Sequence, residues 1–391
     1  MKSDWKECCL GDIVSLTIDH RGLTPKKLGG DWAEDGYRAL SAKNVKTGKI
    51  VQTESIRFVN EEMYHRWMPE EIEYGDILVT SEAPFGEIYQ WNSEEKIVLS
   101  QRLFGIRISP TYDADYIYFY MTTDMFKGEM HARATGTTVI GLRQPELLKC
   151  KIKYPDVNTQ KKISAVLRSI EKKIKINEEI NENLSDQIQA IYSNEFDHTT
   201  HTPSGVLADI CHYSSDRIPV SELSISTYYS TENMQPNKAG AVDATSLPSI
   251  SQTTKCHKGD VLISNIRPYF KKIVYVTEDN CGCSTDVLCF VPNETIYSSF
   301  LLSTLYMDRF FDYMVSGSKG TKMPRGDKQQ IMNYPVVIPN KKELEFFNGI
   351  VIPMLDQIAT NRIENVKLAA LRDALLPKLM SGELDVSDID L

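Results

Sequence analysis

The 391-residue sequence has no stretch of about 18 apolar residues, the length that a membrane-spanning helix needs, and its first ten residues are mostly polar or charged. No signal peptide is apparent, and we expect a cytoplasmic protein. The eight cysteines are scattered, without the spacing of a disulfide framework. Both absences indicate an intracellular protein that builds ordinary hydrophobic cores.

A possible zinc site can be sought among four cysteines and one histidine of the second half, Cys256, His257, Cys281, Cys283 and Cys289. A sequence repeat, described below, aligns three of these cysteines with apolar residues: Cys256 with Ile72, Cys281 with Ile97 and Cys283 with Leu99. Because cysteine behaves as a small apolar residue when buried, we interpret them as core positions and expect no metal site.

Short motifs of several enzyme classes are also missing. The sequence contains no Gly-x4-Gly-Lys-Ser/Thr phosphate loop, no Gly-x-Gly-x-x-Gly loop and no His-Glu-x-x-His motif. It has no Pro-Pro pair, and so no Asn-Pro-Pro-aromatic motif of amino-methyltransferases. The nearest match to a nuclease is Asp76 followed by Glu94, Glu95 and Lys96, and its repeat around Asp260 lacks the lysine. We interpret the Glu-Glu-Lys run as a hairpin tip, and both aspartates as turn residues.

The net charge is −9, which counts against binding to the phosphate backbone of nucleic acid. The charge is unevenly distributed, however. Residues 316–328 carry four basic side chains against one acidic one, whereas residues 381–391 carry four acidic ones. The distribution therefore leaves room for a local basic surface.

A repeat organises the chain. Residues 75–81, Gly-Asp-Ile-Leu-Val-Thr-Ser, match residues 259–265, Gly-Asp-Val-Leu-Ile-Ser-Asn, and the offset of 184 positions holds without a gap from about residue 72 to residue 196. Upstream the offset drifts to 189 and then 197, so insertions fall in the first part of each half. Short strand-like runs precede a helix in each copy. We expect an α+β fold of two tandem domains, each followed by a long helix.

Residues 160–196 read as a heptad seam, and the copy of this seam lies near the C-terminus. Two asparagines interrupt each seam in the same register, Asn177 and Asn181 in the first and Asn361 and Asn365 in the second. Buried asparagines at seam positions need polar partners, so we expect an antiparallel coiled coil with pseudo-two-fold symmetry, in which the two pairs face each other. Pro353 should interrupt or kink the second helix near its start.

These patterns predict six segments: a first domain over residues 1–157, a central helix over 158–196, a linker over 197–205, a second domain over 206–340, a C-terminal helix over 341–381 and an acidic tail over 382–391. A helix of 37 residues spans roughly 55 Å at about 1.5 Å per residue. That length exceeds one turn of DNA, about 34–36 Å, so two domains on such a spacer could contact a split target.

Candidate DNA-binding residues are polar or basic side chains at positions where the sequences of the two halves align. In the first half they are Lys43, Asn44, Ser81, Gln101, Arg102, Arg133, Thr135, Gly136, Thr137 and Arg143. In the second half they are Tyr229, Ser230, Thr231, Asn233, Asn265, Arg267, Thr285, Lys319, Gly320, Thr321, Lys322 and Arg325. The glycine-containing loops around Gly136 and Gly320 recur with threonine and basic neighbours, which suits a close approach to phosphate.

The whole chain resembles the specificity subunits of type I restriction-modification systems. The resemblance rests on the domain-helix-domain-helix order, on the repeated Gly-Asp-Ile/Val-Leu strand and on residues 228–234, Tyr-Tyr-Ser-Thr-Glu-Asn-Met. It rests most specifically on residues 371–384, Leu-Arg-Asp-Ala-Leu-Leu-Pro-Lys-Leu-Met-Ser-Gly-Glu-Leu, which are similar to the C-terminal signature of the family.

This resemblance implies a non-catalytic subunit with two target recognition domains, each reading one half of a bipartite, asymmetric DNA sequence. It implies two methylation subunits and ATP-dependent restriction and translocation subunits as partners, which would use S-adenosylmethionine, ATP and Mg²⁺, with no cofactor in this chain. Two alternatives stay open: a recognition module with its own nuclease or methylase activity, and a scaffold that binds only proteins.

Overall fold

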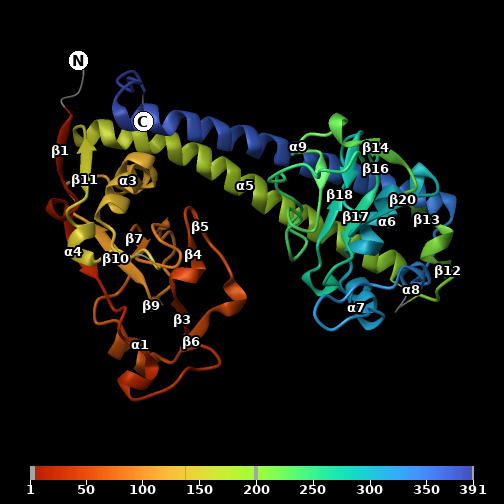
Figure 1. Cartoon of the computed structure of the whole chain (residues 1–391), viewed down its shortest axis with the longest axis horizontal. Helices are drawn as coiled ribbons and strands as arrows, with labels where there is room; N and C mark the ends of the chain where they lie inside the picture. The colour runs from red at the N-terminus through yellow and green to blue at the C-terminus, as the bar shows by residue number, and fades with distance from the viewer. Residues whose placement is uncertain (1–4, 137, 198–200, 390–391) are drawn as a thin grey trace. The chain divides into compact units, whose positions relative to one another are not determined.

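The computed structural model describes residues 5–136, 138–197 and 201–389, and it divides into two compact units (Figure 1). Unit 1 comprises Met1–Ile174 and Val366–Leu391, and unit 2 comprises Lys175–Asn365. Each unit includes part of both long helices, whereas the expected boundaries separated the helices from the domains. Residues 198–200 of the expected linker and 390–391 of the expected tail lie outside the described residues.

The main sheet of unit 1 is antiparallel, with the order β2-β10-β7-β8. Its strands are β2 (Val14–Ile18), β10 (Leu103–Ile108), β7 (Ile77–Thr80) and β8 (Ile88–Gln90). Every residue of β7 is buried, because Ile77 and Val79 join a core with the helices while Leu78 joins the core under a second sheet. A strand covered on both faces explains the unbroken run Ile-Leu-Val-Thr.

Two helices pack on this sheet, α2 (Ala114–Thr122) and α3 (Asp124–Arg133). Each begins at a capping side chain: Asp113 accepts a hydrogen bond from the Tyr116 backbone N–H at 2.7 Å, and Thr123 accepts one from the Phe126 N–H at 3.3 Å. The remaining regular elements near them are α4 (Gln144–Leu147) and the strand pair β1 (Lys6–Cys9) and β11 (Lys151–Tyr154).

The second sheet of unit 1 has the order β6-β3-β9, and its strands are β6 (Arg57–Val59), β3 (Tyr37–Leu40) and β9 (Ile97–Leu99). Strands β3 and β9 run parallel. The short helix α1 (Glu61–Trp67) starts at Asn60, whose side chain accepts from the Met63 N–H at 2.9 Å, and it buries Trp67 in this core. A small hairpin of β4 (Val45–Lys46) and β5 (Lys49–Ile50) follows β3.

Unit 2 repeats the main sheet with the order β13-β20-β17-β18. Its strands are β13 (Cys211–Tyr213), β20 (Val287–Pro292), β17 (Val261–Ser264) and β18 (Ile273–Tyr275), and its helices are α6 (Ser298–Tyr306), α7 (Asp308–Ser316) and α8 (Lys328–Met332). The second sheet, by contrast, has four strands in the order β14-β16-β19-β15. They are β14 (Arg217–Pro219), β16 (Gln252–Cys256), β19 (Cys281–Cys283) and β15 (Tyr228–Tyr229), and the pair β12 (Gly205–Val206) and β21 (Pro335–Val336) completes the unit.

The repeat in the sequence is also a repeat in the structure. Strands β7 and β17, β9 and β19, and β10 and β20 begin and end at an offset of 184. Two isolated bridges around the glycine loops recur at the same offset: Thr135 with Gly141 matches Lys319 with Arg325, and Glu82 with Gly141 matches Ile266 with Arg325. The second sheets differ, which agrees with the insertions expected in the first part of each half.

The long helices are α5 (Val157–Phe196) and α9 (Lys341–Ser381). Within unit 2 their paired segments run antiparallel, because Asn177 contacts Asn365 while Asn181 contacts Asn361. Apolar residues of both helices join the core of unit 2, among them Ile188, Tyr192, Leu344, Phe347, Val351 and Ile358. The expected antiparallel pairing of the asparagine layers is confirmed.

Pro353 does not interrupt the second helix, so that part of the prediction was wrong. Helix α9 is continuous from Lys341 to Ser381. A proline inside a helix removes one hydrogen bond and costs about 3 kcal/mol, but here Phe347 and Val351, within the two turns before the proline, bury their side chains almost completely. Burial of this apolar face stabilises the helical path through the proline.

Cys256, Cys281, Cys283 and Cys289 are buried in one core cluster of unit 2 with Leu262 and Val274, as expected for apolar positions. All eight cysteines are free thiols. Over the described residues, no helix is both long enough and apolar enough to span a membrane.

Candidate nucleic-acid interface

Asn44 and Asn233, both expected to contact DNA, instead hold their own loops. Each is at least 95% buried, and each side-chain oxygen accepts hydrogen bonds from the backbone and the hydroxyl of a serine three residues earlier, Ser41 or Ser230. The amide of Asn44 donates to the carbonyl of Gln52 at 3.1 Å, and that of Asn233 to the carbonyl of Val242 at 2.8 Å. Their hydrogen-bonding capacity is used inside each unit, where it fixes the conformation of the neighbouring residues.

The neighbours that these asparagines position remain accessible. Lys43 is exposed in unit 1, while Ser230, Thr231 and Tyr229 are half-buried in unit 2. The Thr231 carbonyl accepts a hydrogen bond from the Lys272 ammonium at 2.5 Å, which ties this loop to the main sheet. Both loops thus present polar side chains from a rigid support.

A second group of candidate DNA-binding residues lies where strands β7 and β17 end. Ser81 and Asn265 are nearly buried and make equivalent backbone hydrogen bonds. The Ser81 N–H donates to the Arg102 carbonyl and the Asn265 N–H donates to the Asp286 carbonyl, both at 2.8 Å. Asn265 Oδ1 is buried and has no hydrogen-bond partner in the described part of the chain. Arg267 adopts a left-handed conformation with φ of +51°, and its Nε is also buried without a partner.

The glycine loops follow α3 and α7. Gly136 and Gly320 have φ of +114° and +104°, which strongly favour glycine. Thr135 and Thr321 beside them are exposed, and Thr137 lies outside the described residues. Both loops therefore keep a backbone conformation that other residues would strain, with hydroxyl and basic side chains around it.

Ion pairs separate the candidate basic residues into two groups. Arg133 lies 3.4 Å from Glu129 and 3.8 Å from Glu146, and the other paired residues are Arg102 with Glu82 (3.0 Å), Lys319 with Asp327 (2.7 Å) and Arg325 with Asp286 (3.1 Å). In the described ranges no carboxylate pairs with Lys43, Arg143, Arg267 or Lys322. This second group has charge free for phosphate.

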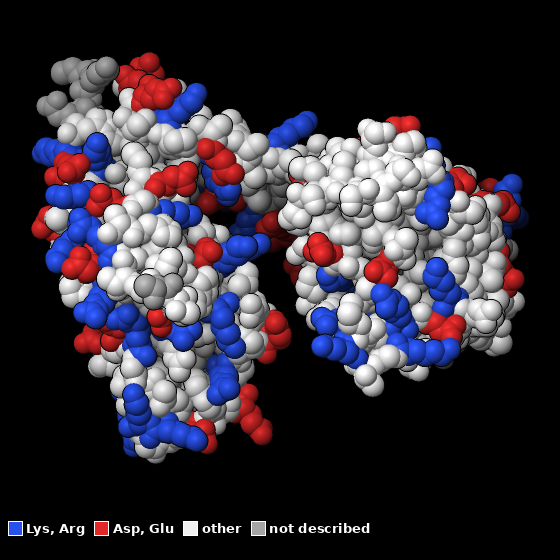
Figure 2. All heavy atoms as spheres, in the orientation of Figure 1, with Lys and Arg blue, Asp and Glu red and all other residues white. Residues whose placement is uncertain are grey.

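The distribution of charge differs between the units. In unit 2, lysines and arginines gather around α7, while the face over β14 and β16 carries little charge (Figure 2). In unit 1, basic and acidic side chains are interspersed over the visible face. The net charge of −9 therefore does not describe the local surface at α7.

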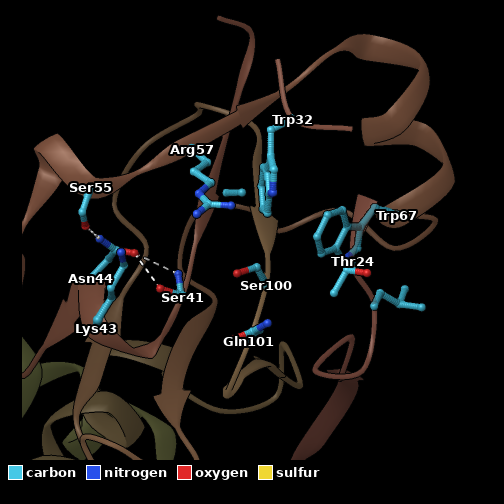
Figure 3. Close-up of a pocket in the computed structure, with 12 residues that line it drawn as sticks. Thr24, Trp32, Ser41, Lys43, Asn44, Ser55, Arg57, Trp67, Ser100 and Gln101 are labelled. Carbon is cyan, nitrogen blue, oxygen red and sulfur yellow. Dashed lines mark hydrogen bonds between the residues drawn. The ribbon is translucent and has the colours of Figure 1, made fainter. Parts of the chain in front are cut away.

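Unit 1 contains a cavity of about 190 Å³ between its second sheet and the loop that carries Lys43 (Figure 3). Lys43, Asn44 and Gln101 line it, together with nine residues that the sequence did not single out as candidate DNA contacts, among them Trp32, Arg57 and Trp67. The Arg57 guanidinium carbon lies 5.0 Å from the centre of the Trp32 ring. The Trp32 and Trp67 rings are 6.0 Å apart and tilted by 47°.

Unit 2 has a cavity of about 370 Å³ in the corresponding place, lined by Ser230, Thr231, Asn233 and Ser284. Both linings contain hydroxyl and apolar side chains, but that of unit 2 adds three carboxylates, Glu232, Asp243 and Asp286, whereas that of unit 1 has none and contains Lys43 and Arg57. The two cavities therefore offer different hydrogen-bonding groups: ammonium and guanidinium donors in unit 1, and carboxylate acceptors in unit 2. Thr285 lies exposed next to the second cavity.

Comparisons with known proteins agree with this duplicated arrangement. The family model for the type I restriction modification DNA specificity domain matches residues 2–186. The MjaIX specificity subunit of a type I restriction enzyme of Methanocaldococcus jannaschii is 24% identical over 94% of this chain and 87% of its own length. The MjaVIII specificity subunit of the same organism is 28% identical over 44% of this chain and 41% of its own. Residues 2–186 thus match the type I restriction modification DNA specificity domain, and the chain is similar over nearly its whole length to a type I specificity subunit.

The crystal structure of a type I restriction-modification S subunit from M. genitalium has the same fold. It superimposes with a TM-score of 0.56 over 97% of this chain and 96% of its own, at 16% identity. The two α+β units and the long helices that run through them are therefore a fold shared with that S subunit.

The aspartates that directly precede β7 and β17, Asp76 and Asp260, are turn residues, as expected. Asp76 accepts from the backbone of Glu73 at 2.9 Å, as a turn residue does, and also pairs with Arg107 at 2.8 Å. Its repeat Asp260 accepts from the His257 N–H at 2.8 Å, but position 291 is valine and supplies no cation. Burial, with the Cys289 thiol nearby, raises the pKa of Asp260 to about 7.

The acidic run that resembled a nuclease motif is engaged in ion pairs on the surface. Glu95 pairs with Arg38, and Lys96 lies 2.9 Å from Glu71. Over the described residues, no group of three or more histidine, cysteine or acidic side chains is placed to hold a metal ion.

Sequence reasoning missed Trp32, Arg57 and Trp67 because they lie in the region where the repeat offset drifts. Each comes from a different segment: the loop before β3, strand β6 and helix α1. The available signal in the sequence was Trp67 itself, a tryptophan at the end of a short capped helix, followed by Met68 and Pro69. Only the fold brings the three together.

Proposed function

We propose that this specificity subunit reads a bipartite, asymmetric DNA target, with one half-site for each unit. The observation that carries the proposal is that corresponding loops and cavities of the two units have matching backbone elements but different side chains. A shared frame supports a shared docking geometry, and different side chains support different bases. A two-fold arrangement would suit a duplex, which has the same symmetry.

The subunit would act without chemistry of its own. Its partners would be two methylation subunits that use S-adenosylmethionine and restriction and translocation subunits that use ATP and Mg²⁺. The long helices α5 and α9 would hold the two readers at a fixed spacing and dock those partners. The polar layers of asparagine support this role because they select one register.

Salt dependence of DNA binding tests the proposal. The complex of this chain with its methylation subunits should bind duplex DNA, and the logarithm of its affinity should fall linearly with the logarithm of salt concentration. The isolated chain with DNA, Mg²⁺ and S-adenosylmethionine should neither cut nor methylate. Activity of the isolated chain would favour a fused enzyme, and a complex that ignores DNA would favour a protein-only scaffold.

A further inference from the structure

The cavity of unit 1 contains an unused hydrogen-bond donor. Trp67 is 1% exposed, and its Nε1 is buried with no hydrogen-bond partner in the part of the chain that the structure describes. An indole N–H can only donate, and leaving it unpaired in the interior costs free energy. Trp91 in the same unit shows the usual solution, because its Nε1 donates to the Glu95 carbonyl at 3.1 Å.

The size of the cavity suits a single aromatic ring system. A cavity of about 150 Å³ is known to take a benzene molecule, and this one measures about 190 Å³. Trp67 forms one of its walls, and Trp32, which is half-exposed, forms another (Figure 3). A flat ligand entering from solvent would meet an aromatic face first and the buried N–H afterwards.

Arg57 marks the position of that ligand. Its guanidinium lies 5.0 Å over the Trp32 ring, the place that a stacked base takes on an aromatic platform. Arg57 is exposed, and no carboxylate in the described ranges pairs with it. It is thus free to leave the ring and bind a phosphate when a base replaces it.

We propose that this cavity binds one unstacked nucleobase, which stacks on Trp32 and accepts a hydrogen bond from Trp67 Nε1. The lining carries donors from Trp67, Lys43 and Arg57 and no carboxylate. It therefore favours a base edge rich in acceptors, as guanine presents with O6 and N7. The inference rests on the proposed function for the source of the base, which is a displaced nucleotide of the bound DNA.

Free nucleotides test this site on the full-length chain. Titration with dGMP, followed by calorimetry and by fluorescence of the four tryptophans, should give saturable binding at millimolar concentrations, tighter than for dCMP. Deoxyribose 5-phosphate should bind at least tenfold more weakly than dGMP. Equal binding of the two would reduce the site to a phosphate contact and overturn the proposal, as would no binding of dGMP.

Matched tryptophan variants identify the donor. Trp67→Phe keeps a ring in the wall but removes the N–H, so dGMP should bind about tenfold more weakly without a lower unfolding temperature. Trp91→Phe removes an N–H that is already bonded, so the unfolding temperature should fall while dGMP affinity stays within twofold. The proposal is overturned if both variants bind dGMP equally well. Trp32→Leu, at a half-exposed position, should also weaken binding and serves if Trp67→Phe does not fold.

The same variants separate this proposal from the broader one. If the assembled complex binds duplex DNA but the chain does not bind dGMP, the base site is wrong and the recognition function stands. If the chain binds dGMP but the complex ignores DNA, the recognition function is wrong. In that case the cavity is a site for free nucleotides and the displaced-base account fails.

Discussion

The Asn177 side chain donates from Nδ2 to Oδ1 of Asn365 at 2.8 Å. The repeat offset of 184 converts this pair into Asn361 and Asn181, and Asn361 Nδ2 does donate to Asn181 Oδ1, also at 2.8 Å. The two bonds are therefore equivalent by the internal repeat. These two hydrogen bonds can form together only when the two helices run antiparallel in this register.

Breaking the layer at one position should destabilise the helix pair. Asn177→Leu removes the donor to Asn365 and to Glu364, 2.7 Å away, and should lower the free energy of unfolding by about 1–3 kcal/mol. Asn183→Leu, an exposed asparagine on the same helix, should change it by less than about 0.5 kcal/mol. Urea denaturation measures both. Equal effects would show that the layer has no special role.

Asp260 should make stability depend on pH. Because its pKa is raised to about 7 in the folded state, its contribution is fully present below about pH 4 and is lost as pH rises through 7. Asp260→Asn should therefore gain stability relative to the wild type between pH 5 and pH 8, by about 2 kcal/mol after allowance for solvent screening. Thermal unfolding at several pH values would measure it, and a difference that is flat with pH contradicts the assignment.

Two arginines of the first glycine loop should differ in their effect on DNA binding by the assembled complex. Arg143 is exposed and unpaired among the described residues, so Arg143→Ala should reduce the slope of log affinity against log salt by about 1. Arg133 is paired with Glu129 and Glu146, so Arg133→Ala should leave the slope nearly unchanged. Fluorescence anisotropy over a salt series distinguishes them. The reverse order would place the phosphate contact on the other side of the loop.

Gly136 should be intolerant of a side chain. A Cβ built there lies 2.1 Å from the Val139 carbonyl oxygen, and φ is +114°. Gly136→Ala should strain the loop by about 1–2 kcal/mol, and so weaken DNA binding by up to about tenfold. Gly128→Ala is the control, since a Cβ there meets nothing within 4 Å and alanine favours its helix. If both variants bind DNA alike, the loop is not part of the interface.

The sequence predicted the architecture because its signals are periodic and duplicated. The register of Asn177, Asn181, Asn361 and Asn365 was sufficient to derive the antiparallel pairing, since a buried amide needs a polar partner. Pro353 misled, because the local cost of a proline is smaller than the gain from burying Phe347 and Val351 beside it. Tertiary packing of this kind has no signature in a single position.

Site residues were harder to derive for a physical reason. Asn44 and Asn233 recur because both loops need the same internal hydrogen bonds, whereas residues that read different half-sites should differ between the copies. Recurrence thus selected structural residues, and the drifting offset hid Trp32, Arg57 and Trp67. Their neighbourhood depends on how β3, β6 and α1 come together, which local patterns do not specify.

The central claim is that two different readers in one chain specify two halves of one DNA target. Mapping modified bases in the genome of cells that express this chain with its methylation subunits tests it most directly. The account predicts a single motif of two short specified blocks separated by an unspecified spacer of fixed length, and exchange of residues 206–340 for those of a relative should change one block only. A continuous motif, or a change in both blocks after that exchange, would contradict it.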